Sequence, residues 1–361
     1  MGNGANNMEK RHIPYLDGWR GLAIILVMAF HFFGPNFAFL GALGVFLFFV
    51  LSGHLISRIL FVEKQDLPTF LVRRFSRIIP TFWLFSGAMF IYAAFFQNPL
   101  YRTPPEEIFS TLFFLRTYFP ADISIWAGKI PTGHFWSLNV EEHSYAFLAL
   151  GAFFLARRPG VSRPLIFLAL ATAVIAALNF YYGAHPPEGA SPWFLRSEIA
   201  SIALLLSACH TLIRVQLRPR WSGAVPRWLP IAAFAGGVLI FVNARGLEVL
   251  ASFVLFALTV NHLDSLPKLL QHMLSARILR WFGKCSFSLY LWQQPFYMLA
   301  EKPGASPMLL LGATLATGML SFYCFEDPVR RYLNRKWAQR NAHGTSIAEP
   351  AMPAAQSGPT P

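Results

Sequence analysis

The sequence predicts an all-α polytopic membrane protein in which about ten transmembrane helices enclose a central cavity. First, 55% of its 361 residues are hydrophobic and only 13% are charged, whereas charged residues approach ~25% of an ordinary soluble domain. Second, apolar runs of about 20 residues, the length of a membrane span, recur along the chain. Third, the net charge of +13 comes from basic residues dispersed between these runs. That pattern favours the lipid bilayer over nucleic acid as the partner.

The chain divides into three parts. A cytosolic segment at 1–14 precedes a transmembrane domain at 15–332, and a cytosolic, largely disordered tail rich in Pro and Ala occupies 333–361. The outer loop 98–135 is expected to carry a short helix and to form a lid, and the segment 264–281 is expected to form an interfacial helix. We place the spans at residues 16–34, 41–62, 78–97, 136–156, 165–183, 195–213, 228–243, 247–263, 282–300 and 307–325.

The distribution of Lys and Arg predicts the orientation. About 23 of them fall on the side of the amino terminus and about 6 on the other, so both termini are expected in the cytosol. The amino-terminal residues lack a signal-peptide pattern, because their charges lead straight into a long apolar run. The expected location is therefore the cytoplasmic (inner) membrane of a bacterium, crossed several times.

The first span carries two ionisable residues, Arg20 and His31. They are separated by about three helical turns, so both project from one face at an axial distance of about 16 Å. Each alone is compatible with snorkelling or ordinary packing. Together on one face they indicate a cavity, because ionisable groups within a span usually face a cavity or a partner.

The second span contains Ser52, Gly53 and His54. Ser52 and His54 are candidates for lining the cavity, whereas Gly53 is expected to allow close helix packing. Arg74 and Arg77 precede the third span on the cytosolic side and share a helix face. Such residues often only contact lipid headgroups, but an Arg side chain can also bind a phosphate through two hydrogen bonds.

The fourth span opens with adjacent carboxylates, Glu141 and Glu142, in the same outer half as His31. Neighbours on a helix diverge by about 100°, so only one is expected to face inward. Glu141 is favoured because it shares a polar stripe with Ser137 and Tyr145. A carboxylate beside His31 would fix its tautomer and raise its basicity.

These motifs resemble those of the acyltransferase-3 family of integral-membrane O-acyltransferases over nearly the whole transmembrane domain. The matching segments, in order, are YLDGWRGLAIILVMAFH, GVFLFFVLSGHLIS, RRFSRIIP, FWSLNVEEHSY, GKCSFSLYLWQQPF and FEDPVRR. In that family an Arg and a His spaced as Arg20 and His31 are required for activity. The resemblance implies transfer of an acyl group, usually acetyl, from cytosolic acyl-CoA to a hydroxyl of a cell-envelope or exported carbohydrate.

The resemblance also assigns roles. His31 would act as the general base or carry the acyl group transiently, and Glu141 would orient it. Arg20, Arg74 and Arg77 would bind the donor from the inner half of the membrane or its face. Further candidates for the acceptor site or cavity are Ser52, His54, Glu142, Tyr145, Arg196, Gln293 and Gln294. The family often has His where this chain has Gln293, which leaves only hydrogen bonding at that position.

No bound cofactor is expected, acyl-CoA being a co-substrate, and the cysteines have no metal-ligand spacing. Because only about 30 residues follow the transmembrane domain, no fused esterase domain is expected. The main alternative is a transporter or flippase of a glycan or glycolipid, which would use the same intramembrane charges as a pathway. No internal repeat supports it. A membrane scaffold would leave the buried charges unexplained.

Overall fold

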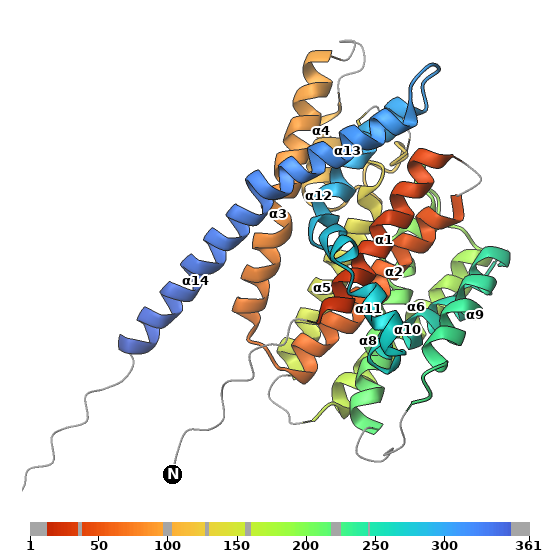
Figure 1. Ribbon diagram of the computed structural model, residues 1–361, viewed down its shortest axis with the longest axis vertical. Coiled ribbons are helices and arrows are strands. Elements are labelled where there is room, and N and C mark those ends of the chain that lie inside the picture. The colour runs from red at the N-terminus through yellow and green to blue at the C-terminus, as the bar shows by residue number, and fades with distance from the viewer. Residues whose placement is uncertain are drawn as a thin grey trace, which may run out of the picture.

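The structure, a computed structural model, describes residues 13–34, 38–96, 103–126, 130–155, 160–217, 225–244 and 246–347. All regular elements within these residues are helices, which confirms the predicted all-α class (Figure 1). The expectations for residues 1–12 and 348–361 lie outside the described part of the chain.

Helices occupy each of the ten ranges predicted to span the membrane. They are α1 Pro14–Phe33, α2 Ala38–Ser57 with its π-helical extension Arg58–Val62, α3 Leu67–Phe96, α5 Phe135–Leu155, α6 Ser162–Ala184, α8 Ile202–Leu217, α9 Leu229–Asn243, α10 Val249–Asn261, α12 Arg277–Ala300 and α13 Pro307–Ser321. The shorter or additional helices are α4 Pro105–Leu112, α7 Ser197–Ala200, α11 Lys268–Leu274 and α14 Asp327–Ile347.

Six helical stretches are long and apolar enough to cross a bilayer, which makes this a multi-pass membrane protein. They are 14–33, 39–62, 67–95, 162–184, 197–217 and 307–341. The helices α9 and α10 are apolar but shorter, and α5 and α12 carry several polar residues. The count of ten spans therefore stays a prediction.

The helix α1 lies at the centre of the bundle, packed against α2 and α12 (Figure 1). Close approach to α12 depends on Gly21 and Gly283, since a Cβ on Gly21 would lie 1.9 Å from the carbonyl oxygen of Leu279, and one on Gly283 as close to that of Asp17. Small residues at such crossings let helix backbones touch. Gly53 plays the predicted packing role, because its Cβ would lie 2.0 Å from a carbonyl oxygen of α8.

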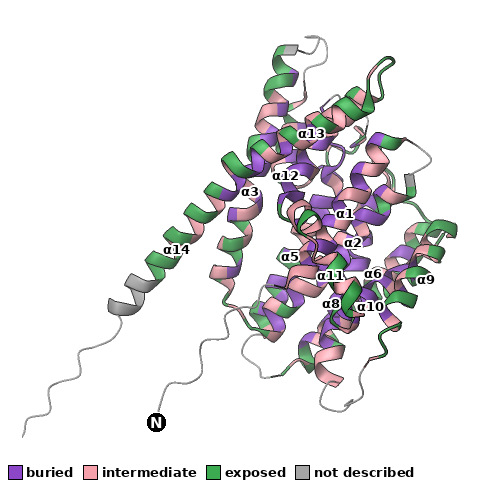
Figure 2. Cartoon of the chain, in the orientation of Figure 1, coloured by how far each residue is buried: buried purple, intermediate pink, exposed green. Residues whose placement is uncertain are grey.

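Burial follows this arrangement. Buried residues concentrate on α1, α2 and α12, whereas α9 and the rod formed by α13 and α14 have few buried positions (Figure 2). Exposed apolar side chains on an outer helix, such as Leu239 and Leu309, fit a surface that faces lipid tails. The central helices are thus the ones available to build an enclosed site.

The helix α3 begins at Leu67 rather than at residue 78. Arg74 and Arg77, which were predicted in the inner half of the membrane or at its face, therefore lie about 10 Å and 15 Å along the helix from its start. The predicted start of this helix was too late, because three arginines in this stretch resemble an interfacial segment, whereas here two of them line a pocket within the bundle.

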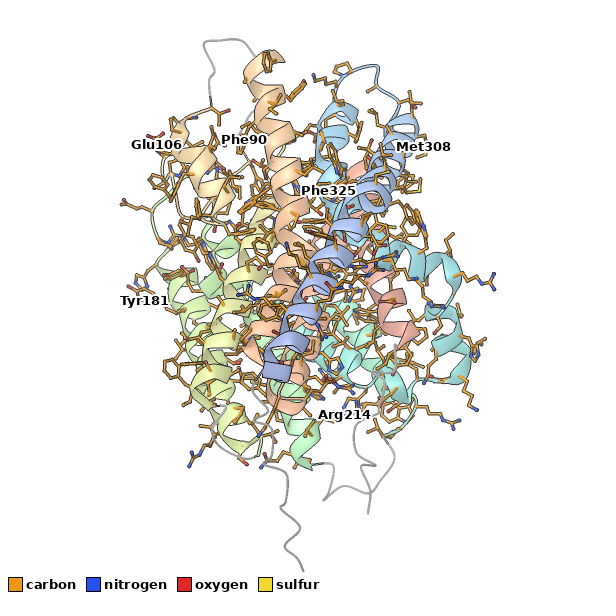
Figure 3. All side chains as sticks on the ribbon, turned by 90° about the vertical axis from the view of Figure 1, so that its left-hand side faces the viewer. Phe90, Glu106, Tyr181, Arg214, Met308 and Phe325 are labelled. Atoms are coloured by element: carbon orange, nitrogen blue, oxygen red, sulfur yellow. The ribbon has the colours of Figure 1, made fainter. Side chains whose placement is uncertain are left out.

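Two other boundaries also differ from prediction. The segment 264–281 is not one interfacial helix, because α11 ends at Leu274 and α12 begins at Arg277. The tail is not largely disordered from residue 333, because α14 continues to Ile347. This helix crosses α3 (Figure 3), where Trp337 Nε1 donates a hydrogen bond to Thr69 Oγ1 at 3.1 Å.

The outer loop has a buried ion pair of its own. Arg116, 1% exposed, pairs with Glu107 of α4 at 3.1 Å and donates hydrogen bonds to two loop carbonyl groups. Tyr118 donates a 2.5 Å hydrogen bond to Glu198 of α7. Burial, reinforced by that hydrogen bond, raises the pKa of Tyr118 to about 12. The short helix predicted for this loop is confirmed in α4.

Candidate active site

Five helices enclose a pocket of about 170 Å³, which we call the arginine pocket after three of its lining residues, Arg20, Arg74 and Arg77. It brings together side chains from α1, α2, α3, α5 and α12. The other polar lining residues are Ser52, Ser137, Glu141, Tyr145, Ser286 and Tyr290. Among the predicted site residues, the three arginines, Ser52, Glu141 and Tyr145 thus meet in one place.

Arg74 is held by both predicted carboxylates. Its Nη2 lies 2.6 Å from Glu142 and 3.4 Å from Glu141, and its guanidinium lies over the ring of Tyr145, 3.9 Å from the centroid. Of the two carboxylates only Glu141 is among the residues that line the pocket. Glu141 was the one favoured for this position. The two carboxylates diverge on α5, but the guanidinium of Arg74 on α3 contacts both of them.

These contacts also correct the predicted depths. Glu141 was expected in the outer half of the membrane and Arg74 in the inner half, yet the two are in direct contact. The early start of α3 carries Arg74 up to the level of the carboxylates. Arg74 and the two carboxylates therefore form one site rather than lying at two separated levels.

The three guanidinium groups differ in their partners. Arg20 pairs with Asp17 at 3.2 Å, and Arg74 pairs with the two glutamates. Within the described residues, Arg77 has no carboxylate within ion-pair distance and no hydrogen bond. The buried Glu326 acts on Arg77 electrostatically without forming an ion pair with it. A cation kept inside a bundle without a direct partner is costly. Arg77 therefore leaves the pocket suited to an anionic ligand.

His31 has a different partner from the one predicted. Its Nδ1 lies 3.1 Å from Oε1 of Gln293, and its ring centroid lies 4.4 Å from that of Tyr297. An amide oxygen only accepts, so Nδ1 carries the proton and Nε2 keeps a lone pair free to accept one. The oxygens of Glu141 instead accept hydrogen bonds from Ser52, at 2.6 Å, Tyr145 and Arg74. Glu141 is thus not the residue that orients His31.

Tyr290 connects the arginine pocket to the surroundings of His31. Its hydroxyl lies 2.6 Å from Ser137 Oγ and donates to the backbone carbonyl of His134 at 2.7 Å. Tyr290 lines the pocket, and Gln293, one turn further along α12, binds His31. Sequence reasoning missed Tyr290 and His134, although Tyr290 stands three residues before Gln293 within one motif.

The remaining predicted residues lie elsewhere. His54 faces α8 and α10, where its Nδ1 lies 2.9 Å from Asn261 Oδ1, because its neighbour Gly53 brings α8 close on that side. Arg196 donates to the carbonyl of Glu188 and lies 6.0 Å from the ring of Tyr118 in the outer loop. Gln294 is half-buried, and its buried Oε1 has no hydrogen-bond partner within the described part of the chain. The structure therefore corrects the predicted place of His54 and Arg196 in the cavity.

Sequence comparison identifies relatives of the chain that builds this site. Residues 13–325 match the acyltransferase-3 family, described as an acyltransferase domain. The peptidoglycan O-acetyltransferase OatA of Listeria monocytogenes is 28% identical over 90% of this chain and 56% of its own length. The putative peptidoglycan O-acetyltransferase YrhL of Bacillus subtilis is 27% identical over 91% of this chain and 57% of its own length.

A further relative is the O-acetyltransferase OatA of Staphylococcus aureus, 24% identical over 89% of this chain and 58% of its own length. The chain thus spans somewhat over half the length of these curated relatives. No solved structure gives a significant match. The match to the family covers α1 to α13 and every residue of the arginine pocket. This multi-pass helical membrane protein belongs to the acyltransferase-3 family.

Proposed function

We propose that this protein is a membrane-bound O-acyltransferase that moves an acyl group, acetyl in the first instance, from acyl-CoA to a hydroxyl of a cell-envelope carbohydrate. The observation that carries the proposal is the arginine pocket, in which Arg77 has no direct ion pair among the described residues. The helix α12 connects this pocket to His31, whose Nδ1 is held by Gln293 and whose Nε2 is available to accept a proton. The names of the relatives favour a peptidoglycan sugar as the acceptor. Family membership also favours this proposal over a transporter or flippase.

The donor would bind through its phosphates. Arg20 and Arg74 are neutralised by carboxylates, so Arg77 supplies the uncompensated positive charge for a phosphate group. Tyr290 and Ser137, at the pocket wall nearest His134, would lie beside the thioester end of the donor. In this arrangement Glu141 and Glu142 hold Arg74 in place and take no proton from the substrate.

His31 would receive the proton of the acceptor hydroxyl. Gln293 holds Nδ1–H, which directs the lone pair of Nε2 away from α12 for this purpose. General base catalysis by a positioned histidine contributes typically ~10²–10⁴-fold to a rate. The alternative role, in which His31 Nε2 carries the acyl group transiently, uses the same tautomer. Acid quench of the purified protein with labelled acyl-CoA, followed by mass spectrometry, distinguishes the two routes by the presence of acyl-His31.

The decisive experiment uses the full chain purified in detergent. Acetyl-CoA is supplied with and without soluble peptidoglycan fragments, and both free CoA and the acetylated sugar are measured. We expect fragment-dependent release of CoA and an ester on the sugar in equal amounts. Absence of CoA release with every acceptor tested would refute the proposal.

The proposed orientation places both termini in the cytosol, the donor on that side and the acceptor outside, in the cytoplasmic membrane. The side chains of Phe109 in α4 and Ser162 at the start of α6 are both exposed and on opposite predicted sides. Cysteine introduced at Phe109 should react with an impermeant thiol reagent in intact cells, and cysteine at Ser162 should react only after permeabilisation. The reverse labelling pattern would invert the orientation.

A further inference from the structure

His134 is a buried histidine without hydrogen-bond partners for its ring. The residue is 5% exposed, and neither Nδ1 nor Nε2 has a hydrogen-bond partner among the residues that the structure describes. Aromatic rings surround it, with centroids of Phe135 at 4.6 Å, Tyr290 at 5.1 Å and Phe85 at 5.8 Å. Its backbone carbonyl is fixed by the hydroxyl of Tyr290 at 2.7 Å. The ring is therefore held firmly in place and has both polar atoms unused.

Gln293 presents a second unused group in the same region. It is fully buried, its Oε1 accepts from His31, and its Nε2 has no partner. Tyr290 joins His134 and Gln293, because its ring centroid lies 5.1 Å from that of His134 and Gln293 follows Tyr290 by one turn of α12. Gln293 and Tyr290, which contacts the His134 ring, share one face of α12. Unused polar atoms from two elements thus lie around the same histidine.

Such atoms are rare in folded proteins, because a buried polar atom without a partner destabilises the fold. Two neighbouring residues with this property, beside a histidine with a free Nε2, indicate a place for a polar ligand group. Gln293 Nε2 can only donate, and a neutral imidazole always carries one N–H. The common property of the two residues is therefore donation to an acceptor oxygen.

Resting on the proposed function, we propose that His134 and Gln293 donate hydrogen bonds to the carbonyl oxygen of the acyl group as it becomes negatively charged. The acceptor hydroxyl oxygen bonds to the thioester carbon while its proton passes to His31 Nε2. The carbonyl π electrons move onto the oxygen, which His134 and Gln293 stabilise. The carbonyl then re-forms, the C–S bond breaks, and the CoA thiolate takes the proton from His31.

Donors fixed in advance in a site shielded from water are effective for this task, because they need no reorganisation when charge develops. Loss of one such donor typically lowers kcat by about 10²–10³-fold. A buried residue that serves only this purpose lowers the stability of the protein when no substrate is bound. Removing the ring nitrogens of His134 should therefore lower kcat and leave the melting temperature equal or higher.

The test replaces His134 by Phe, a ring that suits its aromatic surroundings, in the full chain in detergent. We expect kcat for acetyl transfer to fall by about 10²-fold or more, KM for acetyl-CoA to change less than about threefold, and the melting temperature to stay equal or rise. His134→Gln retains an N–H donor and should recover at least about tenfold of the lost kcat. The matched control is His143→Phe, which removes another α5-side histidine whose Nδ1 contacts Ser197 at 2.8 Å.

The control should keep kcat within about threefold and lower the melting temperature, because it breaks a hydrogen bond. Retention of more than a third of the wild-type kcat in His134→Phe would overturn the proposal. So would a rise in KM at unchanged kcat, or a joint loss of activity and melting temperature, which would indicate a packing role. If the wild-type protein itself neither releases CoA nor acylates the acceptor, the proposed function fails instead, and the two failures are distinct.

Discussion

Two polar clusters lie among the helices of this protein, and they differ in whether their polar atoms have partners. In the first, on α2, α8 and α10, His54 Nδ1 contacts Asn261 and Thr211, Thr211 donates to Asn261 at 2.7 Å, and Asn261 Nδ2 donates to Ser207 at 3.1 Å. In the second, around His31, both ring nitrogens of His134 and Nε2 of Gln293 have no partner. We call these the closed cluster and the open cluster.

The difference between the clusters separates a structural role from a functional one. Both place histidine and amide side chains among apolar helices, where unsatisfied polar groups are costly. The closed cluster meets that requirement within the protein and joins three helices. The open cluster does not, and it adjoins a pocket whose Arg77 is also unpaired. A polar residue within a span therefore indicates a functional site chiefly when its polar atoms have no hydrogen-bond partners within the protein.

The largest effect is expected from His31→Ala in the open cluster. Loss of the base should lower kcat by about 10²–10⁴-fold, while the melting temperature changes little, since the only hydrogen bond of the His31 ring in the described structure is to Gln293. Steady-state acetyl transfer by purified variant and wild type in detergent measures this. A variant that keeps most of its turnover would make His31 a packing residue.

Arg74→Ala should act mainly on stability. It leaves Glu141 and Glu142 as facing carboxylates that are only 18% and 17% exposed, and breaking a buried ion pair costs about 3–5 kcal/mol. Denaturant unfolding in detergent should therefore show a large loss, and activity should fall because less protein is folded. Adding Glu142→Gln to Arg74→Ala should restore part of the stability. A singly substituted protein as stable as wild type would contradict the assignment.

Arg77→Ala should act on donor binding instead. Arg77 forms no direct ion pair among the described residues, and Arg330 still acts on the nearby carboxylate of Glu326, so the free energy of unfolding should fall less than in Arg74→Ala. Hydrogen bonds to charged groups are worth about 1.5–3 kcal/mol, so KM for acyl-CoA should rise by roughly 10–100-fold with kcat nearly unchanged. A lowered kcat at constant KM would argue against contact with the nucleotide end.

Much of the helical framework could be predicted because apolar runs of span length stand out in any sequence. The start of α3 could not, because its arginines have the same composition as an interfacial segment, and only the packing of α14 and α5 beside it distinguishes the two. Arg20, Arg74, Arg77 and Glu141, which the structure brings together in one pocket, could be singled out because charged residues stand out within apolar runs of sequence.

The partners of these residues could not be found in the same way. Which carboxylate meets which guanidinium depends on the relative position of two helices, and the error of eleven residues in the start of α3 corresponds to about 16 Å, half of a ~30 Å hydrocarbon core. Tyr290 and His134 escaped notice since an uncharged tyrosine or a histidine at a helix start is ordinary in sequence. Their significance lies in the atoms that they leave unpaired.

The smallest effect on activity is expected in the closed cluster, from Asn261→Ala. The substitution removes the hydrogen bonds of Asn261 to His54, Thr211 and Ser207, and stranded partners cost about 1–3 kcal/mol of unfolding free energy. Both kcat and KM should stay within about threefold of wild type, because none of these side chains lines the arginine pocket. Gln293→Ala is the comparison: it removes the same kind of amide from the open cluster and should lower kcat with a smaller loss of stability, since Gln293 Nε2 binds nothing before substrate arrives. If Asn261→Ala lowers kcat while leaving the melting curve unchanged, the presence of hydrogen-bond partners does not distinguish a structural cluster from a functional one. His54 would then belong with the reacting groups.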